Sequence, residues 1–127
     1  MVSLDTLQGA PAGTPQRADA QERREGAWLV YPLEGALELY YRDVAGNPSR
    51  RHIIARELKV GPGKTLLGGI DMADDGYRGF RADRIVRIVD AETGRTIDRN
   101  ILDWLIKRAE RQASERRKAA RAVEHHR

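Results

Sequence analysis

Hydrophobic and polar residues alternate along the middle of this chain and change to a helical period near its C-terminal end. In residues 37–42, Leu37, Leu39 and Tyr41 alternate with less apolar positions, which predicts a β-strand with one buried face. Four further segments are also predicted to be strands: 51–60, 64–70, 77–80 and 85–90. The sequence therefore indicates a run of strands before any helix.

Turn-forming residues separate these predicted strands. The segment 43–49 contains Gly, Asn and Pro, residues 61–63 read Gly-Pro-Gly, and residues 75–76 read Asp-Gly, a favoured hairpin dipeptide. The first two strands are therefore predicted to form an antiparallel hairpin. Short strands joined by tight turns, about five here, favour a small, strongly bent antiparallel sheet or a partly open barrel.

A helical pattern begins near Asp98. Apolar residues recur there at helical spacing and make one face: Ile101, Leu102, Leu105, Ile106, Ala109 and Ala113. Asp98 is predicted to cap the helix, since aspartate is a favoured N-cap residue. The face is expected to cover the open side of the sheet, so the fold class is α+β. Dimerisation or docking to a partner protein is the alternative use of this helix, and Trp104, which lies off the main face, fits that alternative.

The chain divides into one domain with two extensions. Residues 1–27 lack a periodic apolar face and are predicted to form a disordered N-terminal arm. Residues 28–113 are predicted to form a single α+β domain, which opens with the apolar cluster 28–31 as a short strand or clasp. In residues 114–127 the apolar face of the helix fades, which predicts a basic tail that frays or projects into solvent.

Composition narrows the class of protein. The chain has 127 residues, of which 40% are hydrophobic and 33% charged, and it contains no cysteine, which excludes disulfide bonds and Cys-based zinc sites. No apolar run approaches the length of a membrane span, so a cytoplasmic protein without a membrane partner is expected. The net charge is +4, and the segment from Asp98 onward carries this whole excess, which permits contact with an anion or a nucleic acid.

Residues suited to catalysis or metal binding do not form a recognisable motif. His52 lies in a predicted strand without a neighbouring nucleophile, and His125 and His126 lie in the tail. Three aspartates crowd the segment 71–75, where turn chemistry explains them. The Gly-Pro-Gly-Lys-Thr stretch at 61–65 lacks the full frame of a phosphate loop. We therefore predict that the protein is not an enzyme and uses no metal ion or cofactor.

A stretch rich in arginine, residues 77–90, offers the clearest binding chemistry. Arg78, Arg81 and Arg84 supply guanidinium groups, which suit phosphates, and Tyr77 adds an aromatic plane, which suits bases. Because side chains alternate along a strand, Arg81 points away from Arg78 and Arg84, so a basic site needs help from elsewhere. Three arginines of the first hairpin could add charge to such a site: Arg42, Arg50 and Arg51.

A purely structural interpretation of this stretch stands beside the functional one. Asp83 can pair with either Arg81 or Arg84. In the structural interpretation Phe80 and Ile85 belong to the core, and Asp83 forms an ion pair with Arg84. The remaining charges are then a solvated face, as charged residues usually are.

The same stretch resembles the C-terminal signature of the WYL domain, a small β-module of bacterial regulators. The resemblance rests on the pattern Arg-x-Phe-Arg-x-Asp-Arg-Ile at residues 78–85. It extends to residues 41–43 (Tyr-Arg-Asp) and 51–54 (Arg-His-Ile-Ile), which are similar to the opening hairpin of that domain, and it covers residues 37–90 in all. The position of the family's Trp-Tyr-Leu triplet reads Thr-Leu-Leu here, at residues 65–67, so the chain resembles a divergent, stand-alone member.

The resemblance implies an SH3/Sm-like sheet and a regulatory role in which basic and aromatic residues bind a nucleic-acid or nucleotide effector. By the motif, the binding candidates are Arg78, Arg81 and Arg84. The leading hypothesis is a non-enzymatic regulatory module that binds single-stranded nucleic acid or a nucleotide-like anion. The alternative is an assembly module that binds a protein partner, or a second copy, through the sheet edge or the C-terminal helix. Binding that weakens steeply with salt favours the first, and loss of a salt-insensitive contact on Leu105→Asp favours the second.

Overall fold

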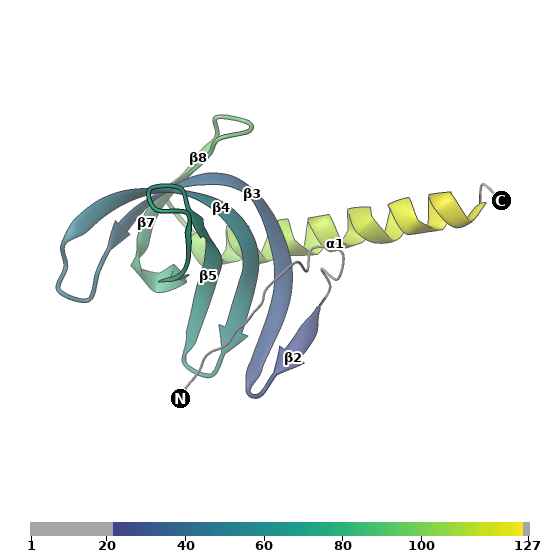
Figure 1. Ribbon diagram of the computed structural model, residues 1–127, viewed down its shortest axis with the longest axis horizontal. Coiled ribbons are helices and arrows are strands. Elements are labelled where there is room, and N and C mark those ends of the chain that lie inside the picture. Colours follow the sequence, from purple (N-terminus) through teal and green to yellow (C-terminus); the bar gives the residue numbers. More distant parts are fainter. Residues whose placement is uncertain (1–21, 126–127) are drawn as a thin grey trace.

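The computed structural model describes residues 22–125, which form one antiparallel sheet and one long helix (Figure 1). The strands are β2 (Arg23–Glu25), β3 (Trp28–Arg42), β4 (Pro48–Gly61), β5 (Lys64–Asp71), β6 (Gly76–Arg81), β7 (Ile85–Asp90) and β8 (Thr96–Ile97). A single 3-10 turn, η3 (Ala82–Arg84), joins β6 to β7, and the helix α1 spans Ile101–His125. The predicted α+β class, with an antiparallel sheet and a C-terminal helix, is confirmed.

The sheet is larger than predicted and open. It has seven strands in the order β6-β5-β4-β3-β7-β8, and β2 pairs with β3 outside this path. Every pairing is antiparallel. Within the described residues β6 and β8 are the two ends of the path and do not pair with each other. Figure 1 shows β3, β4 and β5 curving strongly together, which agrees with the predicted bend.

The first predicted hairpin is confirmed as β3 and β4, but β3 is much longer than the sequence indicated. It runs without a break through Pro32, where we predicted the end of a separate short strand. A shift of register between Pro32 and Gly35 makes the continuation feasible. Proline lacks the N–H that a regular ladder uses, and a bulge is the place where a strand tolerates it.

The end of the segment predicted to be a disordered arm forms strand β2. Arg23 pairs with Glu57 of β4 at 3.0 Å, and Lys59 of the same strand lies 3.7 Å from Glu25. These ion pairs link β2 across β3 to the sheet, and hydrophobic periodicity could not predict them. Residues 1–21 of the predicted arm lie outside the described residues.

The core lies on one face of the curved sheet, beneath α1. The alternation predicted at 37–42 is confirmed, because Leu37 and Leu39 are buried in this core, and the opposite β4 contributes Ile53 and Ala55. Phe80 and Ile85, expected in the core by the structural interpretation, are also buried there. The remaining members of the cluster are Leu33, Leu58, Leu67, Ala82, Ile88, Ile97, Leu105 and Ala109.

The N-terminus of α1 differs from the prediction. The helix begins at Ile101, and Asn100 precedes it with a φ of 51°, while Asp98 lies outside the helix in an exposed position. The first intrahelical contact runs from the Trp104 N–H to the Asn100 carbonyl, at 3.0 Å. Asp98 is therefore not the N-cap residue, because the chain needs three more residues to turn from β8 into the helix.

The buried face of α1 is narrower than the apolar pattern suggested. Leu105, Ala109 and Ala113 are buried against the sheet as expected, but Leu102 is 42% exposed and Arg108 is buried in its stead. Because Leu105 is fully buried, Leu105→Asp would unfold the domain and cannot report on a protein contact. No helix within residues 22–125 is long and apolar enough to cross a membrane.

The segment predicted to fray remains helical as far as His125. Figure 1 shows this half of α1 projecting beyond the edge of the sheet, which agrees with the expected projection into solvent. The side chains of residues 117–123 are all exposed.

Candidate functional site

The arginines predicted to bind an anion are largely neutralised by neighbouring aspartates. Arg78 contacts Asp74 through Nη2 at 2.7 Å and the buried Asp71 through Nε at 3.3 Å. Its hydrogen bond with Asp74 holds the pKa of Arg78 above its usual value. Arg78 lies opposite Gly69 and Arg81 opposite Leu66, so the two arginines occupy opposite faces of β6, as predicted.

Arg81 forms a two-pronged ion pair with Asp83. Its Nε and Nη2 donate to the two carboxylate oxygens at 3.1 and 2.8 Å, and this contact raises the pKa of Arg81 and lowers that of Asp83. The expected pairing of Asp83 with Arg84 is therefore wrong, since Asp83 takes Arg81 as its partner. Arg84 lies in η3, half-buried.

Arg42 and Arg51 of the first hairpin do not complete a site with the arginines of residues 78–84. Arg51 Nη1 lies 3.0 Å from Asp71 Oδ2, so Arg51 and Arg78 meet at one buried carboxylate. Arg42 donates to the Gly46 carbonyl within its own hairpin, at 3.2 Å. The fold therefore does not gather the predicted residues into one basic surface.

The Tyr77 hydroxyl is also committed to a partner within the fold. It donates to the Glu57 carboxylate and lies directly over Gly68, where a Cβ would collide with it. About half of the residue is exposed, but its hydroxyl end is enclosed. Burial, followed by the nearby Glu57 charge, raises the pKa of Tyr77 far above its usual range.

This raised pKa predicts a loss of stability at alkaline pH. In the unfolded chain a tyrosine ionises near pH ~10, whereas folded Tyr77 keeps its proton. Its contribution is thus complete below that pH and is lost as the pH rises further. We expect urea midpoints of the wild type to fall more steeply above pH ~10 than those of Tyr77→Phe. Parallel curves for the two proteins would contradict this assignment.

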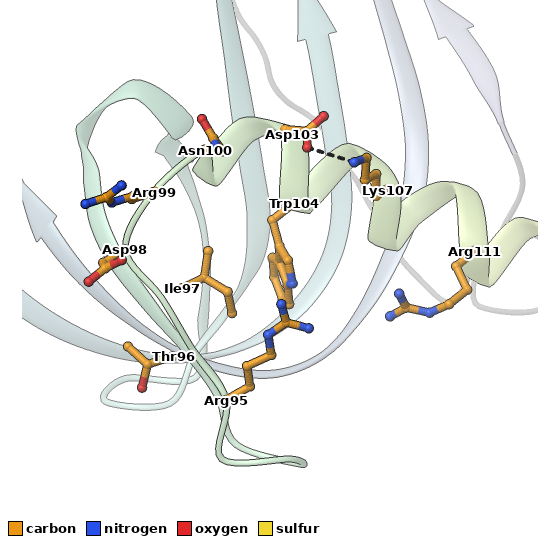
Figure 2. Close-up of a pocket in the computed structure, with 10 residues that line it drawn as sticks. All are labelled: Arg95, Thr96, Ile97, Asp98, Arg99, Asn100, Asp103, Trp104, Lys107 and Arg111. Atoms are coloured by element: carbon orange, nitrogen blue, oxygen red, sulfur yellow. Dashed lines mark ion pairs between the residues drawn. The ribbon is translucent and has the colours of Figure 1, made fainter.

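A different set of cations surrounds a hollow of about 420 Å³ between β8 and the first turns of α1. We call this the basic hollow; Figure 2 shows its lining residues, which are Arg95, Thr96, Ile97, Asp98, Arg99, Asn100, Asp103, Trp104, Lys107 and Arg111. The loop after β7 and the strand β8 supply one wall, and the first three turns of α1 supply the other. The buried Ile97 anchors the first wall to the core.

Three arginines of the basic hollow are free of acidic partners. Lys107 pairs with Asp103 at 3.2 Å, but Arg95, Arg99 and Arg111 form no ion pair with any residue in the range 22–123. All three side chains are exposed. In Figure 2, Arg95 and Arg111 project from opposite walls on the side where the Trp104 indole lies.

Trp104 supplies the aromatic surface of the basic hollow. The residue is half-buried and packs against the core, and the Arg108 guanidinium lies 5.4 Å from its ring centre. Guanidinium groups and an indole ring in one hollow match the two parts of a nucleotide, because phosphate accepts from the guanidinium and a base stacks on the ring.

A second basic surface lies on the opposite face of the sheet. Tyr40 of β3 is in register with Arg50 on one side and Arg87 on the other, and their guanidinium carbons lie 5.9 and 5.1 Å from its ring centre. A groove of about 350 Å³ borders this row. Glu38 neutralises Arg50 at 3.0 Å and also contacts His52 at 3.2 Å, which leaves the row less cationic than the basic hollow.

Sequence reasoning missed the basic hollow although one signal pointed to it. The excess of positive charge lies after Asp98, and Arg99, Lys107 and Arg111 are part of that excess. What the sequence does not show is that β8 folds back beside α1 and brings Arg95 to the same place.

Comparison with known proteins adds no support for a function at the basic hollow, so a function there is inferred from the geometry of the hollow. No protein-family model, curated protein or solved structure matches the chain. Among residues 22–125, no group of three or more histidine, aspartate or glutamate side chains is arranged to hold a metal ion.

Proposed function

We propose that this protein is a non-enzymatic module that binds nucleic acid or a nucleotide-like anion in the basic hollow. One observation carries the proposal: Arg95, Arg99 and Arg111 line one hollow with Trp104, and none of the three forms an ion pair with a carboxylate in residues 22–123. Arginine is suited to phosphate because its planar fork donates two parallel hydrogen bonds. The indole ring stacks on any base, so the hollow would be tolerant of sequence.

The energetics favour the basic hollow over the arginines predicted from the sequence. An anion at Arg78 or Arg81 must displace carboxylates that already lie 2.7 and 2.8 Å away. An anion at the hollow displaces only water and counterions, whose release drives binding. Binding of a phosphate at the hollow therefore has a lower free-energy cost than binding at Arg78 or Arg81.

The test is fluorescence anisotropy of labelled single-stranded oligodeoxythymidine, titrated with protein at low and high salt. We expect Arg95→Gln/Arg99→Gln/Arg111→Gln to lower the magnitude of the slope of log K against log salt by about 2, because each phosphate contact on a single strand contributes roughly 0.7. The affinity of this variant for the oligonucleotide at low salt is also expected to be lower than that of wild type.

Two variants make the result specific to the basic hollow. The control Arg24→Gln/Arg56→Gln/Lys64→Gln removes the same charge from exposed positions on the sheet and is expected to keep the wild-type slope. The variant Arg78→Ala/Arg81→Ala/Arg84→Ala tests the arginines predicted from the sequence and should change the affinity little. Equal losses in the hollow variant and the sheet control would overturn the proposal, as would absence of binding by folded wild type.

The finer predictions from the sequence belong with this proposal. A regulatory role, a likeness to the WYL domain with its SH3/Sm-like sheet, and a cytoplasmic location all stay predictions. Binding of a nucleotide effector at the basic hollow is compatible with them, although the motif itself pointed to residues 78–85 instead.

A protein-interaction module is the second candidate, and the open edge of β6 favours it. Within the described residues, this strand pairs only with β5, so its other side presents unpaired backbone groups. Such a contact would depend little on salt. The helix face from Ile101 to Ala113 no longer supports this function, because its central side chains are buried against the sheet.

A further inference from the structure

The last turns of α1 stand clear of the sheet and of the other residues that the structure describes. All side chains in residues 117–123 are exposed, and Figure 1 shows the helix leaving the sheet behind at this point. Most helices are stabilised by packing, but no described residue packs against this part of α1. The exposed side chains of this segment therefore indicate which kind of partner it binds.

That surface carries a basic strip that begins in the hollow. Lys107 and Arg111 line the hollow, and Lys118 and Arg121 follow on the same side of the helix. At 3.6 residues per turn these four side chains fall within a sector of about 80°, and they span about 21 Å along the axis. The strip faces away from Leu105, which lies on the buried side. A row of cations on one side of α1 therefore leads from the hollow to the projecting end of the helix.

The charge of the projecting half selects the kind of partner. Residues 116–123 contain four cations, Arg116, Arg117, Lys118 and Arg121, between the flanking acids Glu115 and Glu124, so this half of the helix has a net positive charge. Their apolar residues are three alanines and Val123, too little for the continuous seam that a coiled coil requires. A second copy of this helix would also bring like charges together. The complementary partner is a polyanion.

We propose that the polyanion is duplex DNA and that the projecting half of α1 enters its major groove. A helix with its side chains is about 10–12 Å across, and the B-form major groove is about 12 Å wide. The major groove of duplex RNA is deep and narrow and does not admit such side chains. Arg95 and Arg99 in the basic hollow would then hold the flanking phosphates, while stacking on Trp104 would apply to unpaired bases only. This inference rests on the proposed function and specifies its ligand.

The experiment compares duplex DNA, duplex RNA and single-stranded DNA of one sequence by anisotropy over a range of salt. The helix variant is Arg117→Gln/Lys118→Gln/Arg121→Gln, in which glutamine keeps a high helix propensity. We expect wild type to bind duplex DNA more tightly than duplex RNA. On duplex DNA the helix variant should lower the magnitude of the salt slope by about 3, at roughly 0.9 for each phosphate contact. Circular dichroism verifies that the variant stays helical.

The outcomes separate this inference from the function beneath it. If the helix variant keeps the wild-type slope on duplex DNA while the hollow variant loses single-strand binding, the helix inference is overturned and the proposed function stands. Equal affinity of wild type for duplex DNA and duplex RNA also overturns the proposal that the helix enters the major groove of DNA. If wild type and the hollow variant are indistinguishable on every probe, both proposals fail. The sheet control Arg24→Gln/Arg56→Gln/Lys64→Gln accounts for the change in net charge.

Discussion

Replacing Arg108 by alanine is expected to lower the free energy of unfolding by about 3–5 kcal/mol, because the buried Asp90 then loses its charged partner. Both residues are only 4% exposed, and Arg108 Nη1 lies 3.1 Å from Asp90 Oδ2. Within the described residues this is the only ion pair with both side chains buried, so water cannot replace the missing guanidinium as it would at the surface.

The same guanidinium also satisfies the backbone at the bulge of β3. Its Nε and Nη2 donate to the Glu34 carbonyl at 3.1 and 2.9 Å. Gln112 completes the contact, because its side chain donates to that carbonyl and accepts from the Glu34 N–H, both at 2.9 Å. Arg108 and Gln112 therefore attach α1 to β3 at the bulge between Pro32 and Gly35.

Urea denaturation of Arg108→Ala measures this cost, and Arg117→Ala is the matched control. Arg117 is exposed on the same helix, so its replacement should change stability by no more than about 0.5 kcal/mol. Arg108→Met/Asp90→Asn should recover part of the loss, because it removes both charges and keeps most of the volume. A loss for Arg108→Ala as small as that of the control would show that the buried pair contributes nothing.

Gly35 lies at the same bulge of β3, and its contact with Arg108 explains why a glycine occurs inside this strand. Its φ is 137°, and a Cβ at this position would overlap the Arg108 guanidinium. Residues with side chains rarely adopt such a φ. The guanidinium can therefore lie against β3 only where residue 35 has no side chain.

The sequence could predict the elements whose burial follows a simple period. The alternation at 37–42 and the apolar spacing from Ile101 to Ala113 each identified an element and its buried side. The burial of Arg108 could not be predicted from the sequence, because its partners, Asp90 and the Glu34 carbonyl, are distant in the chain. A charged residue on a helix otherwise indicates the solvent side, so period alone assigns it wrongly.

The outcome for the candidate site has a similar physical origin. Asp74 lies four residues before Arg78 and Asp83 two after Arg81, so local spacing already contained the information that these cations are paired. The basic hollow depends instead on β8 returning beside α1, and a two-residue strand gives almost no signal in the sequence. Local pairing was available to sequence reasoning, whereas this long-range approach was not.

Asp71→Ala is expected to destabilise the protein by about 2–3 kcal/mol, since hydrogen bonds to charged groups contribute roughly 1.5–3 kcal/mol. The Asp71 side chain is 1% exposed. Its Oδ2 lies 3.0 Å from Arg51 and 3.3 Å from Arg78, and its Oδ1 accepts from the Ala73 N–H at 3.0 Å. The cost stays below that of Arg108→Ala because both arginines are partly exposed and regain water when the carboxylate is gone.

The two arginines are expected to act as substitutes for each other, which gives a sharper test. Either Arg51 or Arg78 alone still neutralises Asp71, so each single alanine substitution should cost about 1 kcal/mol or less. The double substitution leaves a buried carboxylate without a partner and should cost clearly more than the sum. Urea denaturation of the four proteins in this cycle measures the coupling. Additive costs would contradict this coupling and would mean that Asp71 is held by its contact with the Ala73 N–H instead.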